Sequence, residues 1–85
     1  MTTILVVTKD VVTGEATTSP QMYRNIGEAK RAWGNAIAEL SKNNPSNVPI
    51  RDLQLWQLGE FNTETLEIKP KTDLVCNAVE FLAEV

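Results

Sequence analysis

The sequence predicts an α+β fold: a small antiparallel sheet of about four strands, one main helix packed on it, and a short C-terminal helix or strand. Two observations lead to this prediction. Short segments rich in β-branched and aromatic residues lie near both ends of the chain, separated by turn residues, and one long central segment repeats apolar residues at helical spacing. A chain of 85 residues is long enough for one domain, spanning residues 1–85, with one core.

The chain opens on TTILVVTKD, and residues 3–9 are expected to form the first strand because β-branched side chains favour extended backbone. The next segment, VVTGEATTSP, contains Gly14 and Pro20. These residues predict a turn near Gly14, followed by a weaker extended segment that runs toward Met22 and Tyr23.

The main helix is expected over NIGEAKRAWGNAIAELSKN, residues 25–43. Asn25 and Glu28 have the spacing of a capping box, in which each side chain binds a free backbone N–H of the first turn. NNPSNVP ends the helix with two prolines among short polar residues. Apolar residues recur at steps of three or four and predict one buried stripe, formed by Ile26, Ala29, Trp33, Ile37 and Leu40.

Gly34 is the weak point of this helix, because glycine costs about 0.5–1 kcal/mol relative to alanine in a helix interior. A close approach by another element would explain it. Lys30 and Arg31 fall away from the predicted stripe and are expected to face solvent.

A hairpin is predicted where RDLQLWQLGEF and LEIKP flank the polar link NTET, pairing residues 52–60 with 65–69. Pro70 is expected to end the second strand, because it has no N–H to donate. The first strand has two apolar faces: Leu53 and Leu55 point to one, Trp56 and Leu58 point to the other, and Phe61 returns to the first.

A single helix stripe can cover only one of these faces. Either the C-terminal segment or a second subunit must cover the other, and we predict a homodimer with this strand near its interface. The C-terminal segment KTDLVCNAVEFLAEV is ambiguous. Leu74, Ala78, Phe81 and Val85 fit a helical stripe, whereas alternate residues from Val75 onward fit a strand; we favour a short helix.

Composition argues against an enzyme. Cys76 is the only cysteine and there is no histidine, so the sequence predicts no disulfide, no Cys/His metal site and no cofactor. Without an imidazole to activate it, Cys76 is expected to be a small buried hydrophobic residue. The acidic residues lack the spacing of a calcium loop and are expected on the solvated surface.

No membrane span or signal peptide is expected from the sequence, which predicts a cytoplasmic protein.

Charge is distributed unevenly along the chain. The net charge of −3 has the wrong sign for binding nucleic acid by bulk charge, so any DNA contact needs a local basic patch. Arg24, Lys30 and Arg31 could provide one at the helix, although on the sequence alone a plain solvated helix face is the favoured interpretation. Trp33 falls in the apolar stripe and is expected in the core, whereas Trp56 fits the core, a subunit interface or a base-stacking platform.

The segment LWQLGEFNTETLEIKP resembles the hairpin of the small non-structural protein of gokushovirus-type microviruses. In that family an apolar and aromatic strand runs into Leu-Gly-Glu-Phe, then a polar turn, then a strand that ends in Lys-Pro. Leu58 to Phe61 match the first motif, and Lys69 with Pro70 match the second. Upstream, AKRAW, residues 29–33, matches the helix motif Ala-x-Arg-Ala-aromatic, so the resemblance extends over most of the chain.

The resemblance implies a protein made in the cytoplasm of the infected bacterium and absent from the mature virion. Such a protein would bind single-stranded DNA and support viral genome synthesis or the switch from replication to packaging. Arg31 and Lys69 occupy matching positions that could contact phosphate, and the placement of charge adds Arg24, Lys30 and Lys71, with Trp56 as a stacking residue. The alternative is an adaptor that binds the viral replication initiator, the assembling capsid or a host factor through the acidic residues.

Overall fold

A computed structural model describes residues 1–42 and 50–81. The described residues form one antiparallel sheet of five strands in the order β2-β1-β4-β5, with β3 also paired to β1, so the expected α+β fold is confirmed. In chain order the elements are β1 (Thr2–Asp10), β2 (Glu15–Ala16), β3 (Gln21–Tyr23), α1 (Ile26–Lys42), the 3₁₀ turn η1 (Ile50–Asp52), β4 (Leu53–Asn62), β5 (Ile68–Asn77) and the 3₁₀ turn η2 (Ala78–Phe81).

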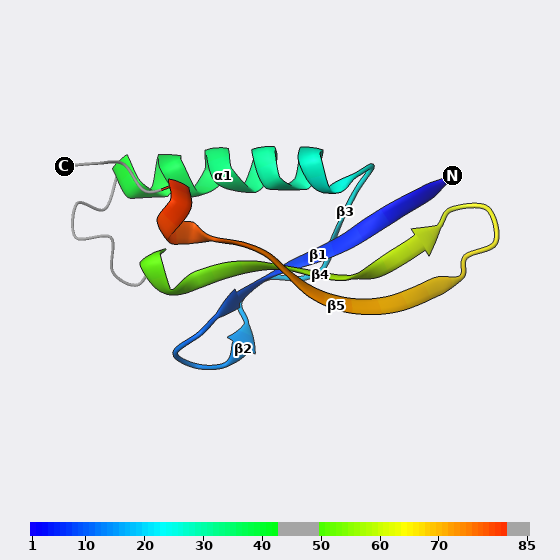
Figure 1. The fold of residues 1–85 in the computed structure, drawn as a ribbon, viewed down its shortest axis with the longest axis horizontal. Coiled ribbons are helices and arrows are strands. Elements are labelled where there is room, and N and C mark those ends of the chain that lie inside the picture. Colours follow the sequence, from blue (N-terminus) through cyan, green and yellow to red (C-terminus); the bar gives the residue numbers. More distant parts are fainter. Residues whose placement is uncertain (43–49, 82–85) are drawn as a thin grey trace.

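The fold has two layers. Figure 1 shows α1 along one face of the twisted sheet, while the β4–β5 hairpin extends beyond the helix near the N-terminus. The molecule is elongated, with extents of 46 × 24 × 16 Å. Its radius of gyration is 13.6 Å, against about 12 Å for a compact domain of this length. None of the helices in the described part of the chain is long and apolar enough to cross a membrane.

The core lies between the sheet and α1. One cluster of buried residues joins Ile4, Val6, Leu55 and Cys76 of the strands to Ala29 of the helix. A second cluster joins Ile37, Ile50 and Ala78, and Trp33 and Phe81 pack against both clusters. We call the face of the sheet that contacts these residues the helix side.

Trp33 belongs to this core, as expected. Its ring meets the Phe81 ring edge to face, with centroids 6.0 Å apart, and its Nε1 donates to Thr8 Oγ1 at 2.9 Å. Cys76 is also buried as expected, with 3% of its surface exposed. Burial and the negative charge of Glu80 raise the pKa of its thiol, while Lys30 acts in the opposite direction.

The predicted N-cap of α1 is confirmed, because Asn25 Oδ1 accepts a hydrogen bond from Glu28 N at 2.9 Å. The Glu28 carboxylate instead forms an ion pair with Arg24, at 3.3 Å.

The apolar stripe expected on α1 was wrong at Leu40, which is 50% exposed. The buried face is rotated toward Gly34 and Ser41, because Phe81 packs against Gly34 on that side. The sequence predicted that the helix ends within NNPSNVP. These residues, 43–49, lie outside the described residues.

The β4–β5 hairpin is longer than the sequence predicted. Pro70 does not end the second strand but lies inside β5, which an edge strand permits because one side of its backbone faces no neighbour. For the C-terminal segment a short helix was favoured. This prediction was wrong for the residues as far as Asn77, because pairing with β4 makes them a strand. Only residues 78–81 turn, as η2, and residues 82–85 lie outside the described residues.

Candidate nucleic-acid interface

The six residues predicted to bind DNA do not form one site. Register assigns faces to the strands, because directly paired residues share a face of the sheet. Trp56 pairs with Val7 and Leu74, whereas the preceding residue, Leu55, pairs with Thr8 and Cys76. Leu55 and Cys76 belong to the helix-side core, and successive residues of β4 point to opposite faces of the sheet. Trp56 therefore lies on the face opposite α1. The predicted cations are Arg24, Lys30 and Arg31 near the helix and Lys69 and Lys71 on β5.

Lys30 lies on the side of α1 that faces β5 and η2. It precedes Gly34 by one turn, and Gly34 packs against Phe81 of η2. The α1 helix also contacts β5, and the Lys30 charge acts on the Cys76 thiol there. Arg31 follows on the adjacent exposed part of the helix. Lys30 is exposed, as expected, although it lies on the side of α1 next to η2 rather than opposite the buried stripe.

The two lysines of β5 lie on the helix side as well. Lys69 pairs with Glu60, and Glu60 pairs with Ile4 of the helix-side core. Lys71 follows two residues later and shares that face. Its Nζ lies 3.6 Å from Asp73 Oδ2, and both side chains are exposed. We call the four cations along this edge the basic flank: Lys30, Arg31, Lys69 and Lys71.

Arg24 does not belong to the basic flank. Its guanidinium pairs with the Glu28 carboxylate at 3.3 Å, and Glu28 lies about 160° round the helix from Lys30, although only about 60° from Arg31. The ion pair, rather than position alone, separates Arg24 from the flank. No ion pair within residues 1–42 and 50–81 involves Lys30, Arg31 or Lys69. Three of the four flank cations are therefore available to a phosphate.

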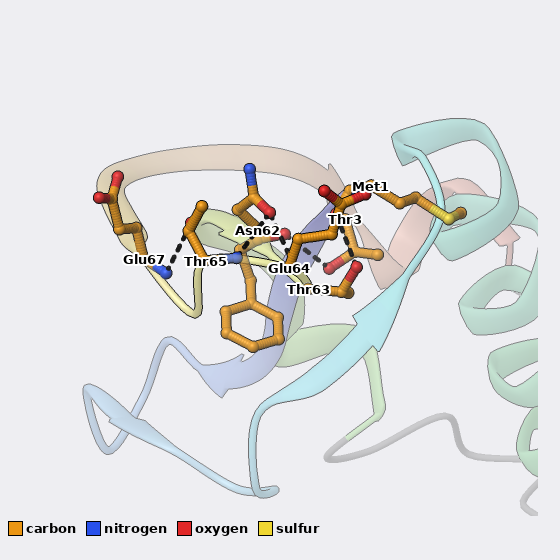
Figure 2. Close-up of polar contacts among 8 residues, drawn as sticks. Met1, Thr3, Asn62, Thr63, Glu64, Thr65 and Glu67 are labelled. Atoms are coloured by element: carbon orange, nitrogen blue, oxygen red, sulfur yellow. Dashed lines mark hydrogen bonds and ion pairs between the residues drawn. The ribbon is translucent and has the colours of Figure 1, made fainter.

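The turn between β4 and β5 is ordered by its own polar side chains, as Figure 2 shows. Asn62 Oδ1 accepts hydrogen bonds from Glu64 N at 2.9 Å and Thr65 N at 3.2 Å. The start of the chain is attached to this turn, because Met1 O accepts from Thr63 N at 2.9 Å and from Thr63 Oγ1 at 3.0 Å (Figure 2). Lys69 therefore projects from an ordered part of the hairpin.

Acidic residues lie next to Lys69. A shallow pocket on the helix side of the hairpin is lined by Glu60 and Glu67 together with Lys69, and by the polar side chains of Thr2, Asn62 and Thr65. Both carboxylates are exposed. This end of the basic flank is thus of mixed charge.

Trp56 has a different set of neighbours. Its Nε1 donates to Gln54 Oε1 at 3.0 Å, and Lys9 Nζ lies 5.2 Å from the centroid of its ring. A pocket beside the ring is lined by Val7, Lys9, Ala16, Trp56, Leu58 and Thr72. Sequence reasoning missed Lys9. The sequence did contain a signal for Lys9. It lies two residues after Val7 in the first strand, and alternate strand residues share a face, so Lys9 could be expected beside Val7.

A β-bulge explains the two apolar faces of LWQLGEF. Leu5 pairs with Gly59 and Val6 with Gln57, so Leu58 is an extra residue in β4. The bulge shifts the alternation, and Phe61, which pairs with Thr3, joins the face of Trp56. The prediction that Phe61 shares a face with Leu55 was therefore wrong.

Comparison with known proteins identifies the family. A model of the family described as Phage ORF5 protein matches residues 3–81, a range that begins in β1 and ends with η2. The chain belongs to the phage ORF5 protein family. Searches of curated proteins and of solved structures return no match. The family match confirms a bacteriophage protein, while the narrower resemblance to microviruses stays a prediction. Both the basic flank and Trp56 lie within the matched range of this phage ORF5 family member.

Proposed function

We propose that this phage ORF5 family protein is a non-enzymatic, microvirus-type non-structural protein that binds single-stranded DNA. It acts in the cytoplasm of the infected bacterium, in genome synthesis or in the switch from replication to packaging, and is absent from the mature virion. The observation that supports the proposal is the basic flank, in which α1 and β5 bring Lys30, Arg31, Lys69 and Lys71 to one edge of the sheet on the helix side. The phage family supplies the biological setting.

The flank suits a single strand in length and accessibility. Lys69 lies seven residues before Cys76 on β5, a path of at most roughly 23 Å at about 3.3 Å per residue, because β5 contains extra residues relative to β4. Lys30, on the helix that contacts β5, influences the Cys76 thiol at the other end of this path. A track of this length could hold about four nucleotides, the lower limit for one small binding domain. The net charge of −3 makes a local contact of this kind the only electrostatic route to DNA.

Fluorescence anisotropy with a labelled oligonucleotide over a salt series tests the proposal. Each phosphate contact on a single strand contributes about 0.7 to the slope of log K against log salt concentration. We expect Lys30→Ala and Lys69→Ala each to lower the slope by about that amount. Lys42→Ala is the matched control, because Lys42 is an exposed helix cation near Glu39 and outside the flank. Binding without salt dependence, or equal losses in all three variants, would contradict the phosphate contacts.

The alternative function, an adaptor for a protein, is favoured by the carboxylates of Glu60 and Glu67 beside Lys69. A surface of mixed charge repels phosphate in part and can pair with a basic partner such as a replication initiator, a capsid protein or a host factor. Pull-down from infected cells with and without nuclease distinguishes the two functions. A partner retained after DNA is digested, and lost in Glu60→Gln/Glu67→Gln, would favour the adaptor.

A further inference from the structure

The face of the sheet opposite α1 is mostly apolar, and no element within residues 1–42 and 50–81 forms a second layer on it. Three mostly apolar rows of paired residues define it: Met22–Leu5–Gly59–Pro70, Thr3–Phe61–Ile68 and Val7–Trp56–Leu74. A fourth row, Ala16–Lys9–Gln54–Asn77, is more polar and bounds the face at one end. We call this surface the open face; Leu58, Lys9, Ala16 and Thr72 adjoin it at the pocket beside Trp56. Its outer apolar residues are strongly exposed: Met22 by 53%, Ile68 by 57% and Leu74 by 44%.

The described part of this chain does not cover the open face. The α1 helix lies on the helix side (Figure 1), where Ala29 contacts the buried strand residues. The C-terminal segment was the other candidate cover. Residues 68–77 are instead part of the sheet, and η2 packs under α1 through Phe81 and Ala78. An antiparallel sheet can leave one face in water, but that face is then normally polar.

The charge of the open face disfavours DNA as its occupant. Among the residues that register and the pocket assign to it, Lys9 is the only charged one, and its ammonium lies over the Trp56 ring. The basic flank lies on the opposite side of the sheet. An apolar surface of this kind matches another apolar surface, and a second copy of the same chain carries one.

We propose that two copies of this chain form a two-fold symmetric dimer by packing their open faces together. The dimer is a β-sandwich whose inner layer contains Trp56, Leu58, Phe61 and Leu74 of both copies. The two-fold axis runs across the strands, between the Lys9 end and the Ile68 end of the face. This orientation places Lys9 over the partner's opposite end and keeps the two ammonium groups apart, whereas an axis along the strands would bring both to the same end of the interface.

The size of the face sets the strength of this dimer. Four strands at about 4.8 Å spacing and about seven residues at about 3.3 Å give a flat surface of roughly 19 × 23 Å, or about 440 Å². Even allowing for side-chain relief, this is at the lower end of specific interfaces, which bury about 800 Å² per partner. We therefore expect a dimer that dissociates in the micromolar range and leaves both basic flanks exposed.

Sedimentation equilibrium over micromolar to submillimolar protein tests the proposal. We expect the mass to rise from the 9.4 kDa of one chain toward twice that value. Leu74→Asp and Ile68→Lys each place a charge on the open face and should hold the protein at the monomer mass. Val12→Asp is the control, because Val12 is 74% exposed in the β1–β2 turn, outside the face. Circular dichroism confirms that each variant is folded.

Two outcomes would overturn the dimer: a wild-type mass that stays at 9.4 kDa at every concentration, or a Val12→Asp effect equal to that of Leu74→Asp. Trp56 emission, measured in a Trp33→Phe background, provides a second readout and should shift to shorter wavelength as the dimer forms. Quenching of Trp56 by an oligonucleotide without a change of mass would show that the face takes DNA instead. The dimer does not rest on DNA binding by the flank, because Lys30→Ala should weaken DNA binding and leave the mass unchanged.

Discussion

The ring of Phe81 packs directly against Gly34, so closely that a β-carbon at Gly34 would lie 2.7 Å from two of its ring carbons. This contact joins η2 to α1 and sets which side of the helix is buried. It also accounts for a glycine in the middle of a helix, where alanine is normally more stable by about 1 kcal/mol.

We predict that Gly34→Ala lowers the free energy of unfolding by about 1–2 kcal/mol despite its better helix propensity, because the added methyl displaces the Phe81 ring. Urea denaturation measures the change. In a Phe81→Ala background the same substitution should raise stability, since the ring is gone and only the helix propensity remains. A stabilising Gly34→Ala in the wild-type background would contradict the contact.

Gly59 allows the backbones of β4 and β5 to approach at the bulge. A β-carbon there would collide with the Lys69 carbonyl oxygen, which is backbone and cannot move aside as a side chain can. We predict that Gly59→Ala costs about 2–3 kcal/mol of unfolding free energy. Gly14→Ala is the comparison, because Gly14 has φ of 75° but nothing within 4 Å of a β-carbon. Its cost should be only the backbone strain of about 1 kcal/mol, and equal losses in the two variants would exclude the steric explanation.

Leu66 has an unfavourable backbone conformation. Its φ is 67°, the left-handed region, and its side chain is 70% exposed in the turn before β5. Asparagine tolerates this conformation better than leucine. We expect Leu66→Asn to raise the thermal midpoint, with a gain of about 0.5–1 kcal/mol. A lower midpoint would indicate that the leucine side chain stabilises the turn through contacts.

Cys76 makes stability depend on pH. Burial raises the pKa of its thiol, so the folded protein resists forming the thiolate while the unfolded chain forms it near its ordinary pKa of about 8.5. This contribution to stability is complete below that pKa and declines as pH rises through it. We expect the unfolding free energy to fall as pH rises above about 8.5. The fall should be smaller in Cys76→Ala, with each protein compared with its own stability at pH 7. If the unfolding free energies of wild type and Cys76→Ala fall in parallel as pH rises, the thiol is not the cause of the pH dependence.

The sequence itself determined the features that depend on near neighbours in the chain. Asn25 caps α1 because its acceptor lies three residues before the N–H that it binds. The first strand, the hairpin turn and the burial of Cys76 follow in the same way from local propensity, turn residues and side-chain polarity. The fold class could therefore be predicted.

Only the tertiary structure decided which side chains share a face. Residues 71–77 fit a helix or a strand locally, and pairing with β4 made them a strand. The extra residue at Leu58 reversed the alternation expected for Phe61 and separated the Trp56 face from the cations of α1 and β5. Lys9 reached Trp56 through the pairing of two strands far apart in the chain. The physical reason is that strand register and bulges depend on hydrogen bonds between distant segments, which no local pattern specifies.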